Sequence, residues 1–89
     1  MGRIRNKVVV KQVSRNIKQI RQEKGITQED FLFDLGIHIG RIEMGNNDIS
    51  CSTLMAICDK LSISPVEFFQ RMENDTQNGY STNLRLTGT

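Results

Sequence analysis

Residues 27–45, with the sequence TQEDFLFDLGIHIGRIEMG, contain one helix start, a turn and a second short helix. Thr27 is a favoured helix cap, and Asp30 three residues later resembles a capping box in which Asp replaces the usual Glu or Gln. Gly36 ends the first of these helices or turns the chain, and residues 37–44 follow as a short helix that ends at the last glycine. Two short helices joined by a tight turn are typical of a helix-turn-helix.

Apolar residues repeat every three or four positions before this segment. The apolar face of residues 9–23 consists of Val10, Val13, Ile17 and Ile20. Because the remaining positions are mostly Lys, Arg and Gln, the spacing predicts an amphipathic first helix. Gly25 ends this helix as a C-terminal cap.

Two further helices follow the segment. A cap at Ser50 or Ser52 starts a fourth helix. Its apolar stripe consists of Leu54, Ile57, Cys58 and Leu61. Ser64, followed by Pro65 and Glu67, is a strong start signal for a fifth helix. The sequence therefore predicts an all-α fold, a compact bundle of five short helices.

The 89 residues are enough for one domain. We divide the chain into a basic N-terminal arm at residues 1–8, a helical domain at residues 9–73 and a disordered polar tail at residues 74–89. No apolar run approaches the roughly 18 residues that a membrane span needs, and no apolar signal core follows the basic N-terminus. We therefore expect a cytoplasmic protein.

Charge is unevenly distributed along the chain. Residues 1–24 hold eight Lys or Arg against one acid, whereas residues 25–89 hold four against nine. This asymmetry suggests that one side of the molecule binds a polyanion, although a solvated helix face with a flexible tail explains it equally well. The arm contains Arg3, Arg5 and Lys7, which either follow a DNA backbone or enter a minor groove, or belong to a disordered solvated terminus.

The inventory of reactive residues argues against an enzyme. One His, two Cys and scattered acids provide no nucleophile–base pair at a recognisable spacing, and the glycines do not form a phosphate-binding loop. Cys51 and Cys58 lie about 10 Å apart along a helix axis, which is too far for a disulfide within it. We expect both to be buried reduced thiols, and we expect no metal ion and no cofactor.

Four short motifs occur in order along the chain: KGITQED at residues 24–30, RIEMG at 41–45, STL at 52–54 and LSIS at 61–64. This ordered set resembles the phage-repressor (Cro/Xre) helix-turn-helix family over residues 10–72. The resemblance implies a lambda-repressor-like five-helix fold and a homodimer. It also implies sequence-specific binding to operator sites in double-stranded DNA, as a transcription repressor or activator.

The chain departs from the family pattern in the helix-turn-helix itself. The interval from Thr27 to Gly45 is about three residues shorter than in the usual motif. Either the second helix has lost nearly a turn or the third helix has lost its tip, and we favour the former. Gly36, Ile37 and His38 then occupy the base-reading positions, where Ile37 can contact a thymine methyl. The alternative removes these positions altogether.

The other candidate DNA contacts lie on and around the third helix. Arg41 falls one turn beyond the base-reading positions and can bind guanine O6 and N7, a phosphate or only solvent. His38 either donates to a base or phosphate or is a partly buried turn residue. Gln28 is either a phosphate ligand at the start of the second helix or a plain helix-start glutamine. Asn46 and Asn47 can bind phosphate, but turn formation alone also explains them.

Two structural roles complete the set of candidate residues. The resemblance implies that Arg21 and Glu43 form an ion pair between the first and third helices. A dimer presents two reading helices about 34 Å apart, as a palindromic site requires. Phe68, Phe69 and Met72 of the fifth helix are the candidate dimer interface, unless all three complete the core of the monomer.

Two functions are therefore open. The first is a dimeric transcriptional regulator that reads a palindromic operator in the major groove. The second is a protein-interaction module on the same scaffold, such as an antitoxin or accessory subunit, with weak or no DNA binding. The shortened helix-turn-helix and the acidic C-terminal part of the chain support the second.

Overall fold

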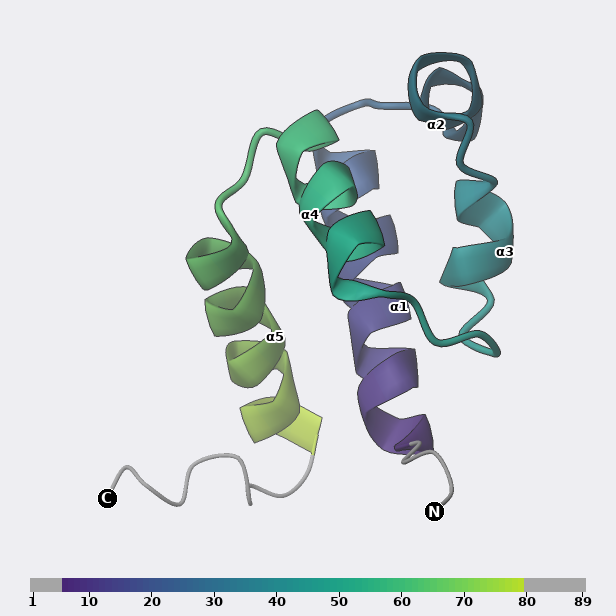
Figure 1. The fold of residues 1–89 in the computed structure, drawn as a ribbon. Helices are drawn as coiled ribbons and strands as arrows, with labels where there is room; N and C mark the ends of the chain where they lie inside the picture. Colours follow the sequence, from purple (N-terminus) through teal and green to yellow (C-terminus); the bar gives the residue numbers. More distant parts are fainter. Residues whose placement is uncertain (1–5, 80–89) are drawn as a thin grey trace.

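The structure is a computed structural model that describes residues 6–79 of the 89-residue chain, with side chains as far as Glu73. Over these residues it is all-helical, as the sequence predicts (Figure 1). The helices are α1 (Lys7–Glu23), α2 (Gln28–Leu35), α3 (Ile39–Glu43), α4 (Cys51–Lys60) and α5 (Pro65–Gly79). None of these five is long and apolar enough to cross a membrane.

The first helix, α1, is the centre of the bundle. In Figure 1, α5 lies on one side of α1, and α2 and α3 lie on the other. α1 contacts both α5 and α3, and α2 packs against α3. The helix-turn-helix therefore forms one edge of the molecule, supported by α1.

Side-chain caps determine where several helices begin. The side chain of Asn6 caps α1, which therefore starts two residues before the predicted position. Thr27 and Asp30 form the predicted capping box: the Asp30 N–H bonds Thr27 Oγ1 at 3.0 Å, and the Thr27 N–H bonds Asp30 Oδ2 at 2.9 Å. The bond from the Thr27 N–H holds the pKa of Asp30 below its usual value. Ser50, the first of the two predicted candidates, caps α4.

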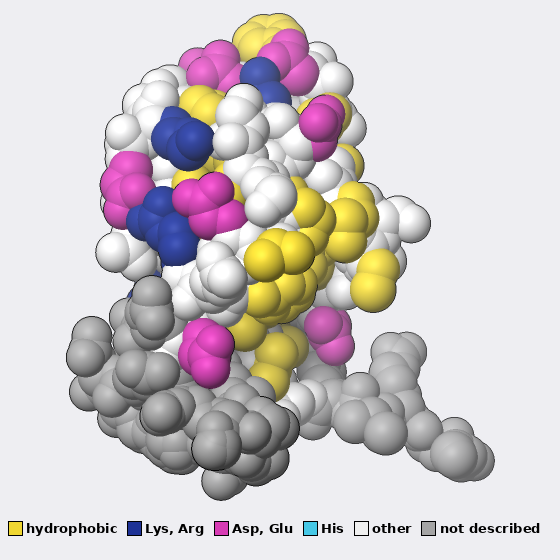
Figure 2. Space-filling view, turned by 90° about the vertical axis from the view of Figure 1, so that its left-hand side faces the viewer, with side chains coloured by type: hydrophobic (Ala, Val, Ile, Leu, Met, Phe, Trp, Pro, Cys, Tyr) yellow, Lys and Arg dark blue, Asp and Glu magenta, His cyan; other side chains and the backbone are white. Residues whose placement is uncertain are grey.

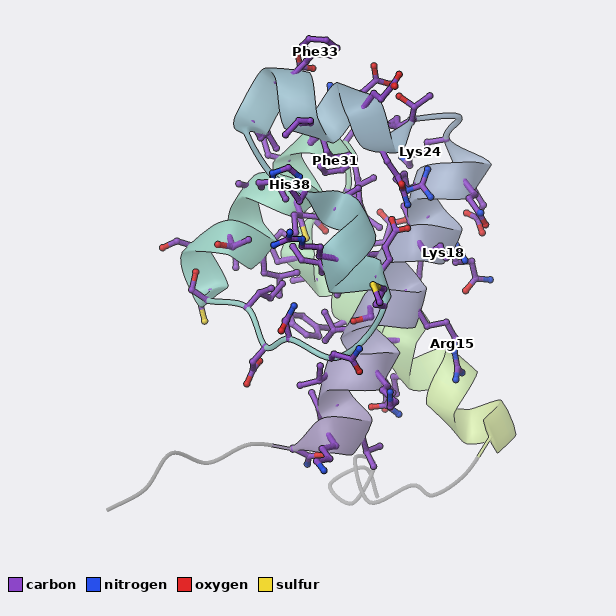
Figure 3. The ribbon with its side chains drawn as sticks, turned by 90° about the vertical axis from the view of Figure 1, so that its right-hand side faces the viewer. Arg15, Lys18, Lys24, Phe31, Phe33 and His38 are labelled. Atoms are coloured by element: carbon purple, nitrogen blue, oxygen red, sulfur yellow. The ribbon has the colours of Figure 1, made fainter. Side chains whose placement is uncertain are left out.

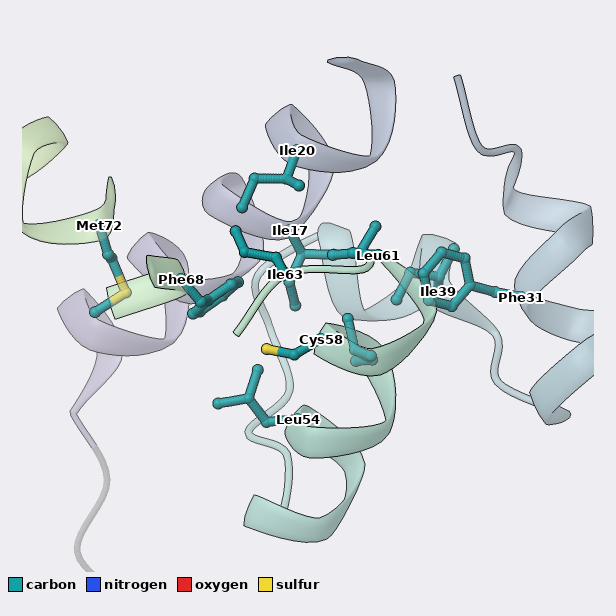
Figure 4. Close-up of a cluster of buried hydrophobic side chains, with 11 residues drawn as sticks. Ile17, Ile20, Phe31, Ile39, Leu54, Cys58, Leu61, Ile63, Phe68 and Met72 are labelled. Atoms are coloured by element: carbon teal, nitrogen blue, oxygen red, sulfur yellow. The ribbon is translucent and has the colours of Figure 1, made fainter. Parts of the chain in front are cut away.

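One hydrophobic core joins all five helices (Figure 4). Its buried members are Ile17, Ile20, Phe31, Ile39, Leu54, Ile57, Cys58, Leu61, Ile63, Phe68 and Met72. α2 contributes only Phe31 to this set, and α3 contributes only Ile39. Because each of these helices has one fully buried anchor, their orientation depends strongly on the polar contacts around them.

The limits of the helical domain differ from the predicted ones. α5 continues to Gly79, beyond the predicted end at residue 73. The sequence pattern stops earlier because Met72 is its last apolar residue, whereas the helix backbone needs no apolar residue to continue. Lys7 belongs to α1 and not to an arm. Arg3, Arg5 and residues 80–89 lie outside the described residues, so the arm and most of the tail stay predictions.

Two of the three predicted dimer contacts belong to the core of the monomer. Phe68 is fully buried and Met72 is 7% exposed, and both pack among the core residues. Phe69 remains 43% exposed and meets Phe68 edge-to-face, with ring centroids 5.4 Å apart. Residues four apart share a helix face, so Phe68 and Met72 turn inward together and only Phe69 is available to a partner.

The two cysteines have different environments. Cys58 is 1% exposed within the core, and burial raises the pKa of its thiol. Cys51 is exposed in the first turn of α4, so the prediction that both thiols are buried is wrong for Cys51. Both are free thiols.

We expect a thiol reagent to modify Cys51 rapidly in the folded protein and to leave Cys58 unmodified, because burial keeps the Cys58 thiol protonated and out of reach. Peptide mass spectrometry after brief exposure to iodoacetamide at neutral pH measures both sites. In denaturant both should react. Rapid modification of Cys58 in the folded protein would contradict the packing of α4.

Candidate nucleic-acid interface

α3 lies on the outside of the bundle, where one edge faces solvent. Figure 3 shows this side of the molecule, with His38 at the start of the helix. On the inner side of α3, Ile39 is fully buried, whereas His38, Arg41 and Met44 are exposed. The segment with the predicted base-contacting residues His38 and Arg41 is therefore open to a large ligand such as DNA.

A buried ion pair fixes the end of α3 against α1. Arg21 Nε donates to Glu43 Oε2 at 2.6 Å, and Arg21 Nη2 donates to Glu43 Oε1 at 3.1 Å. The two side chains are only 10% and 4% exposed. Arg21 Nη1 also donates to the carbonyl of Ile26 at 2.8 Å, which ties the α1–α2 connection to the same guanidinium. The structure thus brings together the pair that the family resemblance implied.

Gln28 joins the same network from the first residue of α2. Its Nε2 donates to Glu43 Oε1 at 3.1 Å. Gln28 is itself exposed, so its side chain lies across the surface of α3 to reach the buried carboxylate. The predicted phosphate ligand therefore already has a partner within the protein.

Gly36 and Ile37 form the turn between α2 and α3 and are not on α3. Gly36 ends α2 in the left-handed conformation at φ 68°, and its N–H bonds the carbonyl of Leu32 at 2.9 Å. Ile37 is partly buried against the core, and its N–H bonds the carbonyl of Phe31. The sequence predicts that both residues occupy base-reading positions, but in the structure neither residue lies on α3.

The two helices of the helix-turn-helix differ in length. α2 has eight residues between the Thr27 capping box and Gly36. α3 has only five residues, against the eight predicted at 37–44. The structure shows that α3 is the shorter of the two helices, whereas the interpretation that the second helix has lost nearly a turn relative to the family stays a prediction.

A shallow hollow separates the outer surfaces of α2 and α3. Its volume is about 380 Å³, and its lining consists of Gln28, Glu29, Leu32, His38, Ile39, Gly40, Arg41 and Met44. Arg41 supplies a guanidinium that can bind a guanine edge or a phosphate, and the apolar side chains can contact thymine methyl groups.

Basic residues of α1 continue this surface, and of these only Lys7 was a candidate DNA contact in the sequence. Asn46, three residues after the end of α3, shares a second hollow of about 370 Å³ with Lys7 and Lys11. Lys7, Lys11, Arg15 and Lys18 are exposed, and their spacing of four, four and three places them along one side of the helix. Figure 3 shows Arg15 and Lys18 on one edge of α1. Their helical spacing was the signal that could have identified them.

Removing one partner of the buried pair should destabilise the fold more than removing one partner of an exposed ion pair. We expect Glu43→Gln to lower the free energy of unfolding by about 3 kcal/mol, because it leaves Arg21 buried without a counter-charge. Urea unfolding monitored by circular dichroism measures this change. Glu23→Gln is the matched control: Glu23 is 47% exposed in its pair with Arg71, and its loss should cost less than about 1 kcal/mol. Equal losses in both variants would contradict the anchoring role of Glu43.

Known proteins share this arrangement. A family model described as helix-turn-helix matches residues 17–68. One similar protein is the restriction-modification controller protein C.Esp1396I, in a crystal structure of its tetramer in complex with its natural 35 base-pair operator. It is 34% identical in sequence to this chain, with a TM-score of 0.66. The match covers 72% of this chain and 88% of that chain. A point mutant of the same controller protein is 31% identical with a TM-score of 0.75, over 81% and 95% of the two chains. Comparison with curated proteins gives no match. Because the family match extends over more than half of its length, the chain belongs to the Cro/C1/Xre-like helix-turn-helix family.

Proposed function

We propose that this protein is a cytoplasmic, dimeric transcriptional regulator and not an enzyme. In this proposal it binds a palindromic operator in double-stranded DNA. The observation that carries the proposal is the short helix α3, which a buried ion pair anchors while its outer edge exposes His38 and Arg41. The similar controller protein C.Esp1396I is bound to its operator, which supports the same class of ligand here.

Within this proposal, the residues divide by what they can contact. Arg41 and His38 provide donors to base edges from α3. Asn46 and Asn47, both exposed after α3, bind phosphate together with the neighbouring Lys11. Gly36 and Ile37 are not among the proposed DNA contacts, because Gly36 caps α2 and Ile37 packs against the core.

The dimer interface that we propose is on the face formed by α4 and α5. Figure 2 shows hydrophobic side chains gathered on this face of the molecule. The exposed large apolar residues of these helices are Met55, Val66 and Phe69, with 46%, 66% and 43% of their surface accessible. Two copies joined here would present two α3 helices to the two half-sites of an operator. One five-residue helix cannot specify such a site alone.

A protein-interaction module remains the second candidate function. The specific observation in its favour is the outer surface of α2, where Leu32, Phe33 and Leu35 are 44%, 83% and 39% exposed. Phe33 points away from the bundle in Figure 3. Exposed apolar residues on this surface are better suited to a protein partner than to a DNA backbone.

We expect the full chain to enrich a preferred sequence from a pool of random duplexes at low salt, and Arg41→Ala to weaken binding to that duplex. The expected loss is about 1–3 kcal/mol, roughly 5- to 150-fold, because the guanidinium can make a bidentate contact to guanine. Fluorescence anisotropy measures the affinity. Arg71→Ala, on α5, removes the same charge away from α3 and should have little effect. A folded protein that enriches no duplex would leave only the second function.

We expect Phe69→Lys to convert the dimer to a folded monomer, because it places a charge in the proposed apolar interface. Sedimentation velocity measures the oligomeric state, and circular dichroism checks the fold. Phe33→Lys is the matched control, since Phe33 is more exposed but lies on α2. An unchanged dimer in the Phe69 variant would place the interface elsewhere.

A further inference from the structure

We propose that Gln28 is a positioning residue that holds α3 in its reading orientation, and that Gly40 is a glycine because the Gln28 side chain occupies the space beside it. The functional consequence rests on the proposed DNA binding. The assignment of Gln28 and Gly40 rests on the contacts between α2 and α3.

The first step is the number of bonds to the Glu43 carboxylate. Oε2 accepts from Arg21, and Oε1 accepts from both Arg21 and Gln28. Glu43 is the last residue of α3, and Gln28 is the first residue of α2. The amide therefore joins the start of one helix to the end of the other, while Arg21 joins both to α1.

The second step is the contact between Gly40 and the same amide. A Cβ on Gly40 would lie 3.2 Å from Gln28 Oε1 and 3.4 Å from its Cδ and Nε2. Gly40 lies within α3 and is not among the described glycines with positive φ, so its backbone does not require glycine. Since glycine disfavours a helix relative to alanine, the space taken by Gln28 is the reason that remains.

The third step is the effect of this contact on α3. The helix has five residues and one fully buried anchor, Ile39 in its first turn. Its other end is fixed by the bonds to Glu43. To bind a phosphate through the same N–H, Gln28 would have to leave Glu43 and release one of these bonds. Held in this bond, Gln28 acts through the orientation of α3 and of Arg41.

A double-mutant cycle tests this role in the full chain. The variants are Gly40→Ala, Gln28→Ala and the double substitution, and Gln19→Ala on α1 is the control for loss of an exposed glutamine. The probes are the selected preferred duplex and a scrambled duplex of the same composition. The measured quantities are the ratio of the two affinities and the melting temperature.

We expect Gly40→Ala and Gln28→Ala each to lower the affinity ratio by roughly 3- to 30-fold, which lies within the range of coupling energies between contacting residues. Affinity for the scrambled duplex should change less than about twofold, because backbone contacts give most of the non-specific binding. The double variant should be no worse than Gln28→Ala, since the new methyl group then meets no amide. In that background, Gly40→Ala should raise the melting temperature, because alanine favours the helix.

Two results would overturn the proposal. One is an equal loss on both duplexes for Gln28→Ala with no effect of Gly40→Ala, which is the behaviour of a phosphate ligand. The other is strict additivity of the melting-temperature changes. If the unmodified chain selects no duplex, the proposed function fails, and the melting temperatures alone decide whether Gln28 and Gly40 are coupled.

Discussion

The structure depends most on the buried carboxylate of Glu43. Burying a charge is costly unless it is paired and hydrogen-bonded, and Glu43 meets this condition through Arg21 and Gln28. The pair connects α3 to α1, and the bond from Arg21 to the carbonyl of Ile26 extends the connection to the chain before α2. Apart from the fully buried Ile39 and the partly buried Ile42, a five-residue helix has few apolar contacts, so this network adds to the limited packing of α3.

The short length of α3 limits what the exposed surface can recognise. α2 has eight residues between the Thr27 capping box and the left-handed Gly36, whereas α3 has five. This surface is a shallow hollow with one guanidinium, one imidazole, one amide, one carboxylate and several apolar side chains. Such a surface offers few hydrogen-bond donors to bases, which increases the importance of a fixed helix orientation and of a second copy of the chain.

Electrostatics divide the remaining surface into two regions. On α1, the exposed cations Lys7, Lys11 and Lys18 lie on one side of the helix and continue the surface at the end of α3. Other cations are paired across helices: Arg71 forms an ion pair with Glu23, and Lys60 forms one with Asp34. The basic N-terminal part of the sequence thus becomes a surface beside the helix-turn-helix, where a polyanion can reach it.

The sequence by itself determined the five helices, most of their starts and most of the core, because caps and apolar stripes involve residues within four positions of each other. The family motifs also identified the Arg21–Glu43 pair and the exposed position of Arg41. Only the tertiary structure decided that α3 has five residues, that Phe68 faces inward and that Gln28 binds a carboxylate. These features depend on how helices distant in sequence approach one another, and spacing along the chain does not encode that geometry.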